Sequence, residues 1–320
     1  MMQNRLTIKD IALLCGVGKS TVSRVINGGH GVNPDTCQRV RQVIAEQRFT
    51  PSKSARSMRG GSEKVIAIIV SRLDSPSESQ AVRAMLPLLY QHGYDPIVLE
   101  SQFQTERVDA HLQVLSERNI DGVIVFGFTG LQARQLTGWQ DKIVLMARPL
   151  HGFSSVCYDD AGAISSLMER LITDGSRHIS FVGVAHHDTT TGKRRAEAYS
   201  ASCQQHGLHE TIALGDLSYQ SGFELLFRVL KPETQAIICA SDTIAIGVCK
   251  ALQQTQSKAI QVCCIGSNPL LHFLFPDTLQ ARLGYHESGK VAVTQLIGQL
   301  TGNLPHRQLI MPLESPLLQQ

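Results

Sequence analysis

The chain has 320 residues, enough for more than one domain with a sizeable core. Its net charge is only +3, but residues 1–64 carry 11 Lys and Arg against 4 Asp and Glu, whereas the remainder carries 19 against 23. The N-terminal piece therefore has a net charge of +7 and the rest −4. Positive charge concentrated in one small piece is what a module that binds nucleic-acid phosphates requires.

The pattern of apolar residues and cysteines predicts a cytoplasmic protein. Apolar runs stop at about seven residues, well short of the roughly twenty that a membrane-spanning helix needs, and no signal peptide is indicated. The eight cysteines include no Cys-x-x-Cys spacing, so we expect reduced thiols. We expect no membrane partner, and a position on the nucleoid only through DNA binding.

The first thirty residues predict two short helices joined by a tight turn. Thr7 sits where a helix N-cap belongs, and apolar residues follow it at helical spacing. Gly16 and Gly18 allow the turn, and a second helix with an inward-facing Val22 comes next. This arrangement is typical of a helix-turn-helix, whose second helix enters the major groove of DNA.

One alternative for this stretch is a phosphate-binding loop, because Gly18-Lys19-Ser20 resembles the end of that motif. The motif requires a glycine five positions earlier, where Leu13 stands. It also requires a preceding buried strand, whereas an amphipathic helix precedes here. The context therefore disfavours a nucleotide site.

The next stretch predicts a third helix and then a linker. Asn33 or Asp35 can cap a helix over about 35–47, in which Val40 closes a three-helix core. Residues 52–62 are short, polar and glycine-rich toward their end. Composition alone favours a flexible linker there.

From Lys64 onward, continuous apolar runs alternate with helical stretches. This alternation predicts parallel sheets that are covered by helices on both faces. About ten strands exceed one comfortable sheet, so we expect two α/β subdomains with a ligand bound between them at the strands' carboxyl ends. The predicted strands are 65–70, 96–99, 122–126, 142–147, 179–184, 236–240 and 261–265, and the predicted helices include 78–92, 106–118, 162–174, 193–206 and 243–254.

Three of the predicted strands lead to arginines, namely Arg72, Arg148 and Arg195. A guanidinium binds phosphate through two parallel hydrogen bonds, so three of them at one cleft mouth indicate an anionic, oxygen-rich ligand. The competing interpretation, that an arginine simply pairs with a nearby acid, stays open for each one. Sugar hydroxyls also need groups that accept hydrogen bonds, and the candidates are Asp74, Glu78, Asp188, Asp242 and Asn268.

An enzyme is the main competing class. His186-His187-Asp188 contains a potential base or metal ligand, but no His-x-x-x-His or His-Glu pair stands near it. No Gly-x-Ser-x-Gly elbow occurs in the chain. We therefore expect no catalytic residue, no metal and no cofactor.

The N-terminal motif also resembles a known family. Thr7-Ile-Lys-Asp-Ile-Ala12, followed by Ser20-Thr-Val-Ser-Arg-Val-Ile-Asn27, is similar to the signature of the LacI/GalR repressors. The resemblance implies an all-α helix-turn-helix domain and an α/β, periplasmic-binding-protein-like (type I) core with two subdomains and parallel sheets. The implied divisions are 1–51 for the DNA-binding domain, 52–63 for a hinge helix and linker, and 64–320 for the core, with subdomains of roughly 64–159 plus 286–309 and 160–285 plus 310–320.

The DNA contacts follow from the helix-turn-helix and the resemblance together. Lys19, Ser20 and Arg24 are expected at base edges, with Arg24 suited to guanine. Thr7, Thr21 and Ser23 are expected at phosphates. The family's hinge wedges an apolar side chain into the minor groove. The complete expected set is Thr7, Lys19, Ser20, Thr21, Ser23, Arg24, Asn27, and, in the hinge, Ala55 and the wedging Met58.

The resemblance extends to the ligand. Arg195 matches the family's ligand-binding arginine, and longer matches such as Arg72-Leu-Asp-Ser and Phe126-Gly-Phe-Thr-Gly resemble trehalose-sensing members. They imply trehalose 6-phosphate as inducer and trehalose as a weaker competitor. Another phosphosugar or a nucleoside is the alternative, since Phe128 and Tyr285 can stack on a ring. The expected ligand contacts are Arg72, Asp74, Glu78, Gly127, Phe128, Arg148, Asp188, Thr190, Lys193, Arg195, Asp242, Asn268 and Tyr285.

The assembly and mechanism are also expectations. The stretch 306–320 lacks a leucine heptad, so a homodimer is expected rather than a coiled-coil tetramer. A dimer places two recognition helices on a palindromic double-stranded operator. The resemblance implies an allosteric repressor of trehalose uptake and utilisation genes, in which ligand in the cleft separates the hinges and weakens DNA binding.

Overall fold

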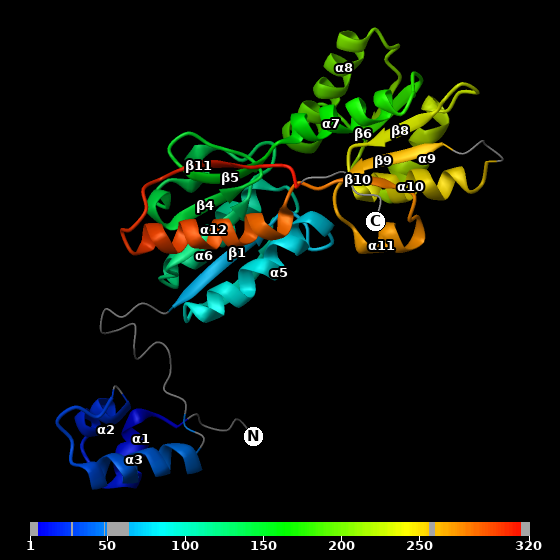
Figure 1. Cartoon of the computed structure of the whole chain (residues 1–320). Helices are drawn as coiled ribbons and strands as arrows, with labels where there is room; N and C mark the ends of the chain where they lie inside the picture. The colour runs from blue at the N-terminus through cyan, green and yellow to red at the C-terminus, as the bar shows by residue number, and fades with distance from the viewer. Residues whose placement is uncertain (1–5, 27, 48, 50–63, 256–259, 315–320) are drawn as a thin grey trace. The chain divides into compact units, whose positions relative to one another are not determined.

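The computed structural model describes residues 6–26, 28–47, 49, 64–255 and 260–314. The chain divides into two compact units, Met1–Glu63 and Lys64–Gln320 (Figure 1). The expected hinge residues Ala55 and Met58, and also Asn27, lie outside the described residues. Among the described helices, none has the length and apolar character that crossing a membrane requires.

The first unit contains the three expected helices, α1 (Ile8–Cys15), α2 (Lys19–Ile26) and α3 (Pro34–Glu46). Thr7 and Asp10 form a reciprocal capping box at the start of α1, and Gly16 ends that helix in the left-handed region with φ 64°. This conformation favours glycine because it has no side chain. Asn33 caps α3. Val22 and Val40 are fully buried in the core between the helices.

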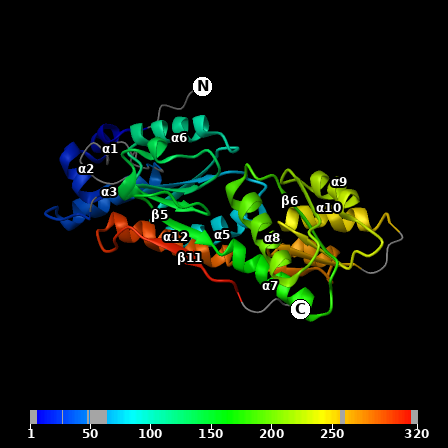
Figure 2. The same ribbon diagram turned by 90° about the horizontal axis from the view of Figure 1, so that it is seen from above.

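The second unit consists of two parallel sheets, each with helices packed against it (Figures 1 and 2). The strand order is β11-β5-β4-β3-β1-β2 in the first sheet and β10-β9-β8-β6-β7 in the second. The strands of the first are β1 (Val65–Val70), β2 (Asp95–Glu100), β3 (Gly122–Phe126), β4 (Ile143–Met146), β5 (Ser154–Tyr158) and β11 (Gln308–Met311). Those of the second are β6 (Ile179–Val184), β7 (Ile212–Gly215), β8 (Ala236–Cys239), β9 (Gln261–Ile265) and β10 (Leu279–Ala281).

The helices divide between the two sheets. The first subdomain contains α5 (Pro76–Gln91), α6 (Thr105–Glu117) and α12 (Tyr285–Leu300), with short 3-10 turns Ala133–Leu136 and Gln140–Lys142. The second contains a π-turn (Thr189–Lys193) and the helices α7 (Asp160–Thr173), α8 (Arg194–His206), α9 (Tyr219–Val229), α10 (Asp242–Leu252) and α11 (Pro269–Leu274). Both views in Figures 1 and 2 show these two sets of elements as separate lobes.

Strand β1 shows why a continuous apolar run predicts this layered arrangement. Its six residues are all buried, and alternate side chains enter different cores. Ile66 and Ile68 join the cluster that contains Met85 of α5, whereas Ala67 joins the cluster that contains Leu112 of α6. Both faces of the sheet are therefore covered, as the sequence predicted.

The predicted fold class is confirmed, and so are the seven predicted strands. Four short strands, β5, β7, β10 and β11, were not predicted. The expected boundary at 309 needs correction, because β11 pairs with β5 as far as Met311 opposite Tyr158. The chain reaches the second subdomain again at Glu314, which bridges to Arg282.

Candidate functional site

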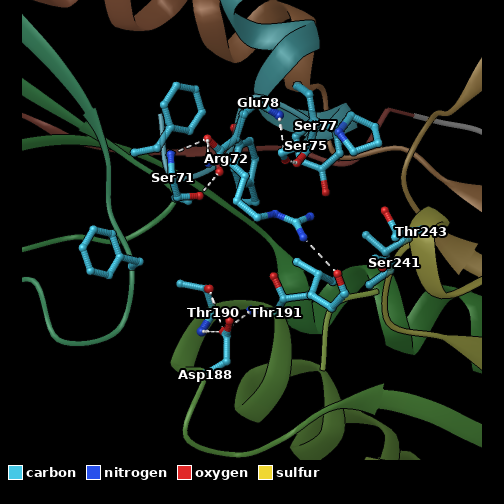
Figure 3. A pocket seen from close by; sticks show the side chains of 18 of the residues that line it. Ser71, Arg72, Ser75, Ser77, Glu78, Asp188, Thr190, Thr191, Ser241 and Thr243 are labelled. Carbon is cyan, nitrogen blue, oxygen red and sulfur yellow. Dashed lines mark hydrogen bonds between the residues drawn. The ribbon is translucent and has the colours of Figure 1, made fainter. Parts of the chain in front are cut away.

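A pocket lies between the two subdomains, where the carboxyl ends of their strands face each other. Its walls come from segments after β1, β3, β6, β7 and β8 and from the start of α5. The space between the walls, with the open mouth included, is about 870 Å³. The side chains converge from both lobes (Figure 3).

Nine of the thirteen expected ligand contacts line this pocket, and four do not. Those in the lining are Arg72, Glu78, Gly127, Phe128, Asp188, Thr190, Arg195, Asp242 and Tyr285. Those outside it are Asp74, Arg148, Lys193 and Asn268.

Arg72 lies at the centre of the pocket and reaches across it. Its Nη1 donates to the carbonyl oxygen of Leu217 at 3.0 Å, the dashed line from its guanidinium in Figure 3. Its Nε lies 3.5 Å from Asp74 Oδ1, a carboxylate that is 80% exposed. The guanidinium carbon stands 6.0 Å from the centre of the Phe103 ring. Exposed Asp74 therefore balances little of the charge on Arg72, since water screens the pair.

Arg195 also lines the pocket, but its charge is already balanced. Its Nη2 lies 2.6 Å from Asp160 Oδ1, its Nε donates to the same oxygen at 2.8 Å, and Nη1 donates to the Ala240 carbonyl. Burial alone would lower the pKa of Arg195, but the interactions with Asp160 and Tyr285 together outweigh it and raise the pKa. Arg195 therefore pairs with a nearby acid, which is the alternative that the sequence left open for each arginine.

Arg148 corrects the expectation that three arginines gather at one mouth. Its Nη1 donates to the carbonyl of Phe128 at 3.0 Å and to that of Leu131. The side chain thus holds the loop after β3 in place and does not reach the pocket lining. Sequence position put the residue at a strand end correctly but did not give the direction of its side chain.

The two other residues outside the lining have structural partners of their own. Lys193 pairs with Glu197 at 3.7 Å, and both side chains are more than half exposed. Asn268 is buried and accepts hydrogen bonds from the Leu270 and Leu271 amides, so it caps α11. Neither is placed to contact a ligand in this pocket.

Two buried carboxyls in the lining are readily protonated. Glu78 accepts from the Ser71 amide at 2.7 Å and from the Ser71 hydroxyl, and burial raises its pKa to about 7. Asp242 is buried, and its Oδ2 has no hydrogen-bond partner within the described part of the chain. Burial raises the pKa of Asp242 to about 6. A ligand hydroxyl pointed at Oδ2 would supply the missing hydrogen bond.

Asp188, by contrast, is used by its own turn. Its Oδ1 accepts from the amides of Thr190, Thr191 and Gly192, which begin the π-turn before α8. The carboxylate thus takes the position that an anion would otherwise occupy at these amides. The phosphate of a ligand is therefore better matched by Arg72.

Several lining residues were not predicted from the sequence. They include Ser71, Ser75, Ser77, Phe103, Tyr158, Asp160, Thr191, Leu217, Ser241 and Thr243. A cluster of serines before a helix signals a cap, and Ser75 does cap α5. No sequence pattern predicts that Phe103 lines the pocket. Its position depends on a loop in which Gln102 (φ 52°) and Phe103 (φ 57°) have left-handed backbone conformations.

The expected DNA-contacting face of α2 is partly corrected. Lys19, Ser20 and Arg24 are exposed, and Thr21 is half-buried. Ser23 is buried at 8% exposure, so its hydroxyl is not placed for a phosphate. Thr7 is exposed, and its hydroxyl is engaged with Asp10 in the capping box.

Comparison with known proteins matches two stretches of the chain to family models. Residues 7–52 match the bacterial regulatory proteins of the lacI family, and residues 63–310 match the periplasmic binding proteins and sugar binding domain of the LacI family. The HTH-type transcriptional regulator TreR of Escherichia coli K12 is 53% identical over 97% of this chain and 99% of that protein. A structure described as the trehalose repressor from Escherichia coli has 51% identity and a TM-score of 0.77, covering 78% of this chain and 98% of its own.

A second structure supports the fold of the complete chain. The Lac repressor dimer bound to operator and the anti-inducer ONPF superposes with a TM-score of 0.84 over 97% of both chains. Its identity is 18%, so this likeness concerns the fold alone. The proteins matched at high identity are transcriptional regulators and not enzymes.

Proposed function

We propose that this chain, which belongs to the LacI family of bacterial regulatory proteins, is a repressor. The genes that it represses would be those for trehalose uptake and utilisation. The similarity to TreR over nearly the full length of both chains supports the choice of trehalose genes. The observation that carries the proposal is the combination, in one chain, of an exposed basic recognition helix with a pocket centred on Arg72. The protein would act in the cytoplasm, on operator DNA.

A homodimer would place two α2 helices in successive major grooves of a palindromic operator. Lys19, Ser20 and Arg24 would read base edges, and Thr7 and Thr21 would lie near phosphates. Ser23 leaves this set because it is buried. The roles proposed for Asn27, Ala55 and the wedging Met58 rest on family resemblance, since these residues lie outside the described part of the chain.

The proposed inducer is trehalose 6-phosphate. Arg72 is the best match for the phosphate, because its fork faces the pocket and its acidic neighbour, Asp74, is exposed. Glu78 and Asp242 would accept hydrogen bonds from sugar hydroxyls, and Tyr285 lines the same wall as Arg195. Unphosphorylated trehalose would occupy the pocket without the Arg72 contact and compete weakly.

A second candidate ligand class is another phosphosugar or a nucleoside. Phe103, Phe128 and Tyr285 all line the pocket, and aromatic faces stack on a planar base. The number of polar side chains in the lining favours the sugar. A nucleoside therefore remains the second candidate.

The test is operator binding at fixed salt, titrated with trehalose 6-phosphate and separately with trehalose. Salt is fixed because phosphate contacts make protein–DNA affinity strongly salt-dependent. Release of the operator by the phosphosugar alone supports the proposal. Release by neither sugar would leave a DNA-binding regulator whose ligand must be sought among other phosphosugars and nucleosides.

A further inference from the structure

Among the described residues, three side chains of the first subdomain hydrogen-bond to main-chain groups of the second. Arg72 Nη1 donates to the Leu217 carbonyl at 3.0 Å, and Gln80 Nε2 donates to the Ser267 carbonyl at 2.8 Å. Thr129 Oγ1 accepts from the Thr189 amide at 2.8 Å. Each contact joins a side chain of the first subdomain to a main-chain group of the second, so each can be removed by changing one side chain.

Arg72 differs from the other two because it is charged and lines the pocket. Gln80, on α5, lies outside the lining, and Thr129 does as well. The residue that this pocket offers to a phosphate is thus also a residue that links the two subdomains.

The geometry of the guanidinium makes these two roles compete. Its Nε is buried and has no hydrogen-bond partner among the residues that the structure describes. Asp74 Oδ1 already stands 3.5 Å from Nε, so the edge formed by Nη1 and Nη2 is the one left for a two-bonded phosphate contact. Nη1 already donates to Leu217. Nη1 has two N–H bonds and one of them already points to Leu217, so a phosphate at this edge competes with the carbonyl for the position of the guanidinium.

We propose that the Arg72–Leu217 hydrogen bond belongs to the operator-binding conformation, and that the phosphate of the inducer breaks it by replacing the Leu217 carbonyl on Arg72. This inference rests on the proposed function and adds how the phosphate is sensed. A neutral carbonyl is a weaker acceptor than a phosphate dianion, so the exchange is favourable. A sugar without phosphate leaves the hydrogen bond intact, and a ligand shifts a conformational equilibrium only through such a difference.

The test uses the full chain, double-stranded operator and fixed salt, with Arg72→Met and Gln80→Met as a matched pair. Each variant removes one hydrogen bond between the two subdomains, but only Arg72→Met also removes the cation. We expect both to bind operator roughly two- to tenfold more weakly in the absence of ligand, the value of one hydrogen bond. Arg72→Met should also lose the preference for trehalose 6-phosphate over trehalose, and Gln80→Met should keep it.

Two results would overturn the inference, and they differ from each other. If Arg72→Met loses the preference for the phosphosugar but binds operator as the wild type does, Arg72 senses phosphate without linking the subdomains, and the proposed function stands. If the wild-type protein ignores trehalose 6-phosphate, the proposed ligand and this inference fail together.

Arg72→Lys guards against a folding defect in Arg72→Met. It keeps the positive charge but has no planar fork, so it cannot form the two-bonded contact. We expect it to bind the phosphosugar more weakly than the wild type and to release operator less completely. Full wild-type induction by Arg72→Lys would contradict the two-bonded exchange.

Discussion

The guanidinium of Arg195 lies 2.6 Å from the carboxylate of Asp160, and both side chains are buried. Asp160 begins α7, directly after the chain passes from β5 of the first sheet to the second subdomain. The ion pair therefore connects the crossing segment to α8, which starts at Arg194. Arg195, which was expected to bind the ligand, instead forms a buried ion pair with Asp160 at the wall of the pocket.

The first prediction concerns the stability of this pair. Arg195→Met leaves a buried carboxylate unpaired, which costs about 3–5 kcal/mol of unfolding free energy. Urea unfolding followed by circular dichroism measures it. Arg148→Met is the control, because within the described part of the chain that guanidinium hydrogen-bonds only to the carbonyls of Phe128 and Leu131. Its loss should cost about 1–3 kcal/mol. Equal losses of unfolding free energy in the two variants would show that the ion pair contributes no more to stability than hydrogen bonds to carbonyls do.

The second prediction concerns base reading by α2. Arg24 is exposed near the end of that helix, so Arg24→Ala should cost about 1–3 kcal/mol of discrimination between the operator and a variant with a changed guanine. Arg39→Ala, on α3, removes the same charge and should weaken both DNAs about equally. Binding to a panel of single-base operator variants distinguishes them. An unchanged preference in Arg24→Ala would remove this residue from the reading set.

The third prediction concerns the start of α1. Thr7→Ala removes the hydroxyl that accepts from the Asp10 amide, so the helix should lose about 0.5–2 kcal/mol, whereas Thr7→Ser keeps the cap. Amide hydrogen exchange within α1 of the full chain reports the loss. Operator affinity should fall with it, because α1 supports the turn to α2. Identical exchange in both variants would mean that the cap contributes nothing.

The fourth prediction concerns pH. Burial raises the pKa of Glu78 from 4.5 to about 7, so between these values the folded chain holds a proton that the unfolded chain has lost. This contribution to stability is complete below about pH 4.5 and disappears as the pH rises through about 7. Glu78→Gln cannot titrate, so it should gain stability relative to the wild type between pH 5 and pH 8.

Melting temperatures of the wild type and Glu78→Gln at several pH values test this sign. Asp242 shows the same trend with a lower pKa, so Asp242→Asn serves as a second variant, whose change falls between pH 3.8 and about pH 6. If the wild type loses no stability relative to Glu78→Gln as the pH rises, the carboxyl is ionised at all these values and its burial costs less than the structure indicates.

Much of the fold could be predicted because burial on two faces leaves a strong pattern. The strands β1, β3, β6 and β9 are continuous apolar runs, and each was placed within its observed bounds. Strands β7 and β11 are short and only partly buried, so their composition does not differ from that of loops. Helix α12 joins the first subdomain although it follows the second in sequence, and only the family resemblance implied that return.

The pocket was predicted less completely, for a physical reason. Strand ends place a residue, but they do not orient its side chain, and Arg148 turned toward carbonyls of its own loop. The partner of Arg72 is a main-chain oxygen of Leu217, which no side-chain pattern can signal. Ser23 is buried although it is polar, because a short helix packed on two others buries some of its polar side chains together with the apolar ones.

In the proposed mechanism, the operator site and the phosphosugar site of one molecule are coupled. The most direct measurement is the affinity for trehalose 6-phosphate by calorimetry, with and without saturating operator, beside the affinity for operator with and without the sugar. Linkage requires both ratios to be equal, and a coupling of about 5- to 150-fold is typical. We predict that operator weakens sugar binding by the same factor by which the sugar weakens operator binding. A sugar affinity that operator leaves unchanged would contradict the account.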